Sequence, residues 1–108
     1  MSNTFKSNVA ANIVTSGNTI YTCPSATQTT LIGMTLSNKS AGTVTANVFI
    51  TRSAVDYSII SNAPIITGST LVPIGGDQKV VLQAADVLKV TTSANGSMDG
   101  IASLLEIA

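Results

Sequence analysis

Hydrophobic and polar residues alternate along most of this chain, in short runs that Gly, Pro, Asn and Ser interrupt. The clearest run covers residues 43–52, where an aliphatic residue or Ala recurs at every second position from Val44 to Ile50. Thr or Asn occupies most of the positions between them, and Phe49 is the one large apolar residue among these. A period of two is typical of a strand with one buried face, so we expect an all-β fold.

The remaining runs extend this interpretation to the whole chain. They predict eight or nine strands and no helix, separated by turn residues at short, regular intervals. The expected strands cover residues 5–14, 19–23, 28–37, 43–52, 57–60, 69–74, 79–83, 87–92 and 98–106. We therefore predict an antiparallel β-sandwich of about eight strands, jelly-roll-like or immunoglobulin-like. The length of 108 residues suits one domain covering residues 1–108.

Several turn signals predict how the strands are joined. The five residues 38–42 form a hairpin-type loop, which predicts that 28–37 and 43–52 pair as an antiparallel hairpin. Asn95-Gly96 predicts another hairpin before the last strand. Turns are also expected at 16–18, 75–77 and 84–86. Gly33, inside a strand, predicts a β-bulge or a close approach by another backbone.

The composition supports a sheet protein with an unusually uncharged surface. Ten Val, eleven Ile and fifteen Thr make up a third of the 108 residues, and β-branched side chains favour strands. Charged residues are only 9% of the chain and the net charge is zero, against about 25% in typical soluble domains. Such a surface suits a protein that neighbours surround, so we expect self-association. The alternative is an internally protected sandwich that is low in charge.

The same composition argues against several functional classes. The five basic residues are spread along the chain, whereas nucleic-acid binding needs them clustered: Lys6, Lys39, Arg52, Lys79 and Lys89. No apolar run is long enough to span a membrane, and the start lacks the pattern of a signal peptide. We therefore expect synthesis in a cytoplasm and export only inside something larger. Cys23, the single cysteine, excludes an internal disulfide and is expected to be a half-buried small hydrophobe.

Nothing in the sequence predicts catalysis or a metal site. The chain has no His, so its Ser residues and Cys23 lack the usual activating base. The acidic residues show no metal-binding spacing, and Asp77 and Asp86 are expected to be turn residues. The five are Asp56, Asp77, Asp86, Asp99 and Glu106. We predict that the protein is not an enzyme and has no catalytic, cofactor-binding or metal-binding residues.

Two features predict contact with neighbouring chains. Residues 1–8 are polar apart from Phe5, and we interpret them either as an N-terminal arm that a neighbour binds or as a frayed end. Residues 48–50 and 80–82 are strongly apolar strand segments that would aggregate if their edges were exposed. Covering such edges with identical copies is the simplest explanation.

Five segments carry a resemblance to a known group of proteins. They are residues 68–82, residues 85–90, Lys6-Ser7-Asn8-Val9, Ile20-Tyr21-Thr22-Cys23-Pro24 and Leu105-Glu106-Ile107. Together they resemble small virion structural proteins of tailed bacteriophages, especially phages of cyanobacteria and related aquatic hosts. Related β-rich modules favour Gly-Asp where this chain has Ala85-Asp86. Because Ala tolerates a positive φ poorly, we expect a different turn geometry there.

The resemblance implies a location in the virion after assembly in the host cytoplasm. It implies a head decoration or cement protein that binds the major capsid protein or other virion proteins and forms a homo-oligomer, most simply a trimer. One alternative is a neck, tail, baseplate or fibre-attachment accessory protein. Another is a host-glycan-binding module, for which Tyr21 and Tyr57 are the candidate exposed aromatic residues. No nucleic acid, membrane or cofactor is implied.

Overall fold

The computed structural model describes residues 3–75 and 79–108, so the predicted turn at 75–77 and its Asp77 lie partly outside the described residues. Within this part of the chain there are nine strands and no helix, which confirms the predicted all-β sandwich. The strands are β1 (Asn3–Ala10), β2 (Asn18–Thr22), β3 (Gln28–Asn38), β4 (Val44–Arg52), β5 (Val55–Ile65), β6 (Thr70–Ile74), β7 (Val80–Leu82), β8 (Val87–Thr92) and β9 (Met98–Ile107).

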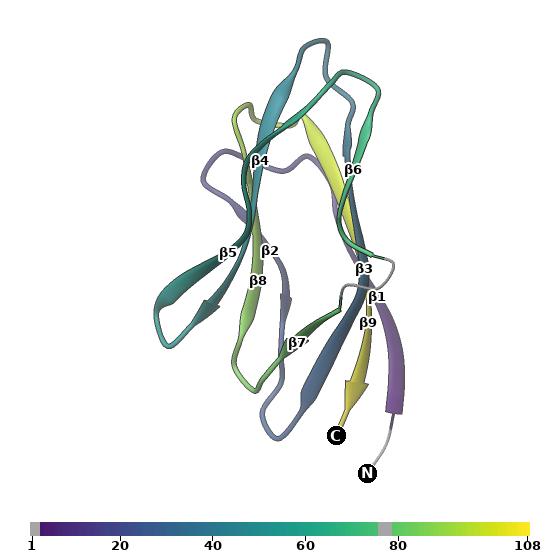
Figure 1. The fold of residues 1–108 in the computed structure, drawn as a ribbon, viewed down its shortest axis with the longest axis vertical. Helices are drawn as coiled ribbons and strands as arrows, with labels where there is room; N and C mark the ends of the chain where they lie inside the picture. The colour runs from purple at the N-terminus through teal and green to yellow at the C-terminus, as the bar shows by residue number, and fades with distance from the viewer. Residues whose placement is uncertain (1–2, 76–78) are drawn as a thin grey trace.

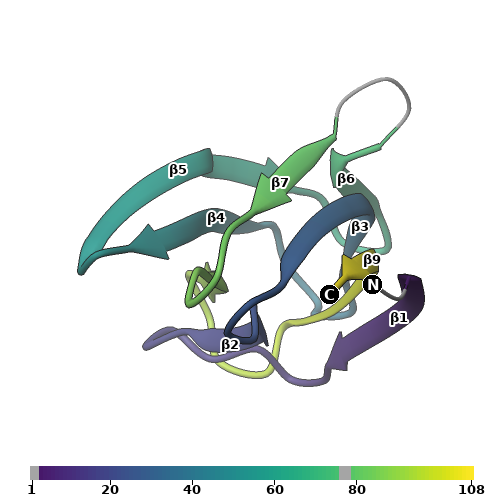
Figure 2. The same cartoon turned by 90° about the horizontal axis from the view of Figure 1, so that it is seen from below.

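The strands form two antiparallel sheets that pack face to face (Figures 1 and 2). Sheet A has the order β1-β9-β3-β6, with β7 also pairing with β3, and sheet B has the order β2-β8-β4-β5. β1 begins and β9 ends at the lower end of sheet A in Figure 1. The edge strands are therefore β1, β6 and β7 in sheet A, and β2 and β5 in sheet B.

The core lies between the sheets and takes its side chains from alternate positions of both. In β4 the buried positions are those that the period of two predicts, Val44, Ala46 and Val48. The largest fully buried apolar side chains are Ile13, Leu31, Met34, Leu36, Ile74, Leu82, Leu88, Met98, Leu104, Val48 and Val90. One apolar layer thus holds the two sheets together, as in other sandwiches.

The predicted hairpin between residues 28–37 and 43–52 is wrong. β3 lies in sheet A and β4 in sheet B, so the loop between them crosses from one sheet to the other. Asn38 fixes this crossing, because its buried side-chain amide donates to the carbonyl oxygens of Gly42 at 2.9 Å and Ile65 at 2.8 Å. Alternation shows that one face of a strand is buried, but not which strand lies beside it.

The hairpin predicted at Asn95-Gly96 is also wrong, since β8 and β9 belong to different sheets. These residues instead hold the connection between β1 and β2. The Thr15 amide donates to the Asn95 side-chain oxygen at 2.7 Å, and the Gly96 amide donates to the Ile13 carbonyl at 2.9 Å. Gly96 has a φ of 71°, the left-handed conformation that glycine adopts without cost.

Three further expectations need correction. The first strand ends at Ala10 rather than at residue 14, because residues 11–14 cross toward sheet B. The short strand expected at 57–60 is the longer β5, Val55–Ile65, which accommodates Pro64 because it is an edge strand. Ala85 has a φ of 72°, so it adopts the left-handed conformation although it is not a glycine. We had expected this turn to avoid a positive φ.

Gly33 confirms one local prediction. The pairing of β3 with β9 shifts by one residue between Leu31 and Gly33, which is a β-bulge. Before this bulge the odd-numbered residues of β3, such as Leu31, are buried, and after it the even-numbered ones, such as Met34, are buried. The bulge therefore keeps both halves of a long strand turned toward one core.

Residues 3–8 of the segment expected to be an arm or a frayed end belong to β1, an edge strand of the domain. β1 pairs with β9 in an unbroken register from Asn3 opposite Ile107 to Ala10 opposite Gly100. Phe5 nevertheless points away from the core, and its side chain is exposed. This segment is thus fixed by the sheet, while its one aromatic side chain remains available for contact.

Candidate functional site

The outer face of sheet A carries the main concentration of exposed apolar side chains. Directly opposite residues of antiparallel strands point to the same face, so the register places them in rows. One row contains Phe5, Leu105, Thr30 and Val81. A second row contains Val9, Ile101 and Thr35. We call the surface formed by Phe5, Val9, Val72, Val81, Ile101 and Leu105 the apolar face.

This apolar face contains most of the large hydrophobic side chains that are exposed. It holds five of the eight large hydrophobic side chains that are exposed in the described residues: Phe5, Val9, Val72, Val81 and Ile101. Phe5 and Val9 are the most exposed of all, at 75% and 70%. The patch presents on the order of 400 Å² of apolar surface, which is within the range of the largest patch on a typical monomer, and such a patch is often functional.

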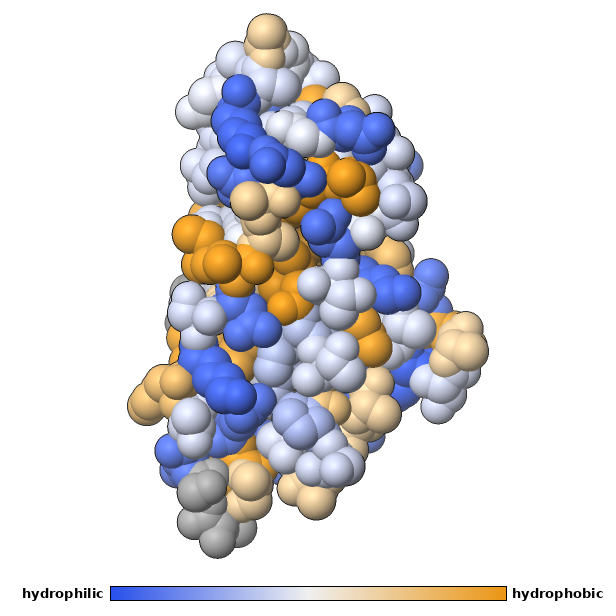
Figure 3. All heavy atoms as spheres, turned by 180° about the vertical axis from the view of Figure 1, so that it is seen from behind, coloured by the Kyte–Doolittle hydropathy of each residue, from blue (hydrophilic) through white to orange (hydrophobic). Residues whose placement is uncertain are grey.

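The outward positions of β1, β3 and β9 are also almost uncharged. In β1, β3 and β9, Asp99 is the single charged residue among the described positions that point outward. Asp99 lies at one end of the face and is neutralised by Lys39, whose Nζ is 3.0 Å from its Oδ1. Figure 3 shows the side of the molecule where β1 lies, above the grey atoms, with hydrophobic patches next to hydrophilic ones.

The sequence contained a signal for this face that the strand prediction did not use. In β9, apolar residues occupy positions of both parities, with Met98, Ala102 and Leu104 pointing inward. Ile101 and Leu105 point outward. A strand with one solvated face would alternate, so β9 has the composition of a strand that is covered on both sides.

A polar network crosses the core from sheet B to sheet A. The Tyr21 hydroxyl on β2 hydrogen-bonds with Thr29 Oγ1 at 2.8 Å and donates to the Glu106 carboxylate. Lys6 Nζ lies 3.1 Å from the other oxygen of Glu106. Burial, followed by the bond to Glu106, raises the pKa of Tyr21, and the same bond is the largest cause that lowers the pKa of Glu106. Tyr21 is only 5% exposed, so it is not an exposed aromatic residue.

Asp86 is a turn residue, as predicted, and its side chain is also buried and has a second partner. Its Oδ2 accepts a hydrogen bond from the backbone amide of Gln83 at 2.8 Å. Arg52, at the end of β4, donates from Nε to Oδ1 at 2.9 Å and from Nη2 to Oδ2. The bond to Arg52 is the largest cause that lowers the pKa of the Asp86 carboxyl. This ion pair ties the turn before β8 to the β4–β5 hairpin.

The other residues considered from the sequence do not lie together in one site. Cys23 is fully buried rather than half-buried, with its Sγ 3.4 Å from the Thr27 carbonyl oxygen. Asp56, on β5, accepts a bond from Thr51 at 2.6 Å. Tyr57 is exposed beside Arg52 and Ile50, where they line a hollow of about 290 Å³. Only one of the two aromatic residues considered for sugar stacking is therefore at the surface.

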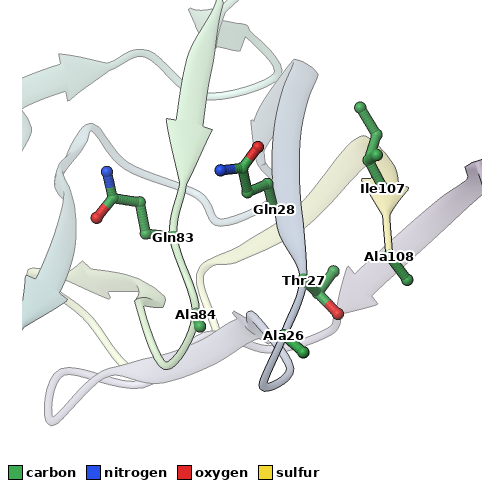
Figure 4. A pocket seen from close by; sticks show the side chains of 7 residues that line it. All are labelled: Ala26, Thr27, Gln28, Gln83, Ala84, Ile107 and Ala108. Atoms are coloured by element: carbon green, nitrogen blue, oxygen red, sulfur yellow. The ribbon is translucent and has the colours of Figure 1, made fainter. Parts of the chain in front are cut away.

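A larger hollow of about 560 Å³ lies at the end of the sandwich near the C-terminus (Figure 4). Small and amide side chains line it: Ala26, Thr27, Gln28, Gln83, Ala84, Ile107 and Ala108. Gln28 comes from the start of β3, and Gln83 follows β7. None of these side chains can serve as a nucleophile paired with a base, or supply a charged metal ligand.

The described residues contain no group of three or more His, Cys, Asp and Glu side chains that could hold a metal ion. They also contain no helix with the length and hydropathy needed to cross a membrane. The feature that stands out on this sandwich is therefore the apolar face of sheet A.

The comparisons with known proteins give a fold relative and no family. No protein-family model matches the chain, and no curated protein matches it. A similar solved structure is a chain from the crystal structure of the T13 IBDV viral particle, with a TM-score of 0.55 and 11% identity. The match covers 96% of this chain but only 30% of that chain. At this identity the likeness shows the fold alone.

Proposed function

We propose that this protein is a non-enzymatic structural component of a virus particle, and specifically a decoration or cement protein on the head of a tailed bacteriophage. The observation that carries the proposal is the apolar face of sheet A, where Asp99 is the one charged residue at the described outward positions of β1, β3 and β9. The fold likeness to a chain of a viral particle supports the coarser part of the proposal. The sequence resemblance supports the finer part.

The proposed mechanism is thermodynamic. A sandwich that binds across two shell subunits contributes its interface free energy only while both subunits keep their assembled positions. The apolar face is suited to this, because β9 lies in the interior of sheet A, and its pairing on both sides holds the backbone that carries Ile101 and Leu105. Burial of apolar surface contributes about 25 cal/mol per Å². The same interface present in many copies would raise the resistance of the shell to internal pressure.

The experiment is reconstitution with particles that lack the protein. Purified protein is added to such particles, binding is measured by co-sedimentation, and genome release is followed during heating. Wild-type protein should co-sediment and raise the release temperature. Ile101→Glu, which places a charge in the middle of the apolar face, should abolish both effects.

Val55→Glu is the matched control. Val55 lies on β5 of sheet B and is 50% exposed, close to the 48% of Ile101. It should bind particles as the wild type does. Binding that is lost equally in both variants, or kept in both, would contradict the assignment of the apolar face. Absence of binding by wild-type protein would contradict the proposed function.

A further inference from the structure

β1 is the least protected sheet edge in the described part of the chain. Edge strands are usually guarded against pairing by shortness, bulges, proline or charged side chains, especially lysine. β6 and β7 are short, and β6 contains Pro73. β2 is short and its pairing with β8 has a register shift, while β5 has two register shifts and contains Pro64. β1 has eight residues, no proline and an unbroken register with β9, and its one charged residue, Lys6, is engaged by Glu106 of the same chain.

β1 also carries the two most exposed large hydrophobic side chains among the described residues, Phe5 and Val9. They are four positions apart on the same strand, so both point to the outer face. Ser7 lies midway between them, opposite Ser103 on the same face. The strand is thus an open edge with an apolar side chain on each side of a central serine.

We propose that β1 pairs with β1 of a second copy of this chain, antiparallel across a two-fold axis through Ser7. In this register the residue numbers of each opposing pair add up to fourteen. Phe5 of one copy then lies opposite Val9 of the other, and this contact occurs twice. Aromatic and β-branched side chains that face each other across strands stabilise the pairing.

The charges of β1 are compatible with this register. Lys6 is the one charged residue on β1, and it is held by Glu106 of the same chain at 3.1 Å. In the proposed pair Lys6 lies opposite Asn8 of the other copy, so no two like charges face each other. The remaining opposing pair is Thr4 with Ala10, both small residues. The side chains of β1 are therefore compatible with antiparallel pairing to β1 of a second copy.

Pairing of this kind has a consequence for assembly. The two copies of sheet A would become one continuous sheet, and their apolar faces would lie side by side on the same surface. A two-fold contact uses the β1 edge of both copies and therefore closes. The register thus favours a dimer, whereas the sequence resemblance suggested a trimer. This inference deepens the proposed function, because it states how two copies would present one surface to the shell.

The first test is disulfide trapping with Ser7→Cys. On the two-fold axis the two introduced side chains have Cβ atoms about 5 Å apart, close enough for a disulfide after small adjustment. Ser103→Cys is the matched control: it lies on the same face, but in the dimer its two copies are about 14 Å apart, or three strand spacings. The native Cys23 is buried and does not interfere.

After mild oxidation, Ser7→Cys should give at least about tenfold more covalent dimer than Ser103→Cys, because pairing holds its thiols at a high effective concentration. Equal cross-linking of both variants would overturn the register. The second measurement is the mass in solution by light scattering at about 100 µM, since an interface this small is expected to be weak. Wild-type protein and Val72→Asp, on the far side of the sheet, should be dimers.

Val9→Asp should be monomeric, because it places a carboxylate opposite Phe5. A wild-type monomer or trimer, or equal dissociation of both Asp variants, would overturn the proposal. These measurements use the purified protein alone. Their failure is therefore distinguishable from failure of the proposed function, which is judged on virus particles.

Discussion

Replacing Tyr21 by Phe removes one hydroxyl from the interior and tests the polar network between the sheets. The aromatic ring keeps its packing, so the variant creates almost no cavity. The variant loses the hydrogen bond to Glu106 and the 2.8 Å bond to Thr29. Glu106 keeps Lys6 at 3.1 Å, and Thr29 Oγ1 keeps Cys23 Sγ at 3.3 Å.

The expected magnitude follows from these contacts. A hydrogen bond to a charged group stabilises a fold by about 1.5–3 kcal/mol. Because both former partners of Tyr21 keep another contact, we expect Tyr21→Phe to lower the free energy of unfolding by about 2 kcal/mol. For a domain of this size that corresponds to a fall in Tm of about 8–16 °C. Tyr57→Phe, on an exposed tyrosine, is the control and should change neither quantity.

The effect of Tyr21→Phe should also depend on pH. The hydrogen bond from Tyr21 is the largest cause that lowers the pKa of Glu106 below its ordinary value of 4.5. A carboxyl whose folded-state pKa is lowered contributes stability above its ordinary pKa and loses this contribution as pH falls through the folded-state value. The difference between wild type and Tyr21→Phe should therefore shrink between pH 7 and about pH 3.

Urea denaturation of both proteins at several pH values measures this difference. A loss below about 0.5 kcal/mol at pH 7 would refute the argument, because it is less than a single neutral hydrogen bond contributes. A difference that stays constant down to pH 3 would show that the charge of Glu106 is not involved.

Two further changes test the turns. Ser53 and Ala54 form the two-residue turn of the β4–β5 hairpin with φ values of 52° and 63°. Replacing them with Asn-Gly should raise the unfolding free energy by about 1 kcal/mol, measured as a rise in Tm, because these residues tolerate a positive φ; an unchanged or lower Tm would contradict this. Asp86→Asn removes the ion pair with Arg52, so it should lower stability at pH 7. Because the folded-state pKa of Asp86 lies below the ordinary 3.8, the loss should diminish in acid, and equal losses at pH 7 and pH 3 in urea titrations would contradict the pairing.

Local patterns predicted the strands of this protein well. The alternation from Val44 to Ile50 identified both β4 and its buried side, and Gly33 correctly indicated a bulge in β3. These features depend on residues close together in the sequence. The period of two and the conformational freedom of glycine therefore suffice to predict them.

Pairing between strands was harder to predict, because it depends on contacts between distant residues. The loop after β3 looked like a hairpin, but Asn38 bonds to Ile65, which is 27 positions away, and so directs the chain to the other sheet. In the same way, Asn95 bonds to the Thr15 amide, 80 positions away, rather than closing a hairpin. No local signal distinguishes these roles from those of an ordinary turn residue.

The sequence predicted that the protein has a covered surface, but it did not predict where on the fold this surface lies. Low charge and β-branched composition indicated a covered surface, while its location required the register of β1, β9 and β3. Tyr21 shows the opposite case. It was considered an exposed aromatic residue, yet its side chain is buried and its hydroxyl donates to Glu106, 85 positions away.

The central claim is that this protein is a decoration protein of a virus head. The most direct measurement is the number of copies per purified virus particle, relative to the major shell protein, by quantitative mass spectrometry. The account predicts a copy number of the same order as that of the shell protein. A few copies, matching the symmetry of a portal or tail ring, would contradict decoration and favour the neck or tail, and complete absence from the particle would contradict a structural role in the virion.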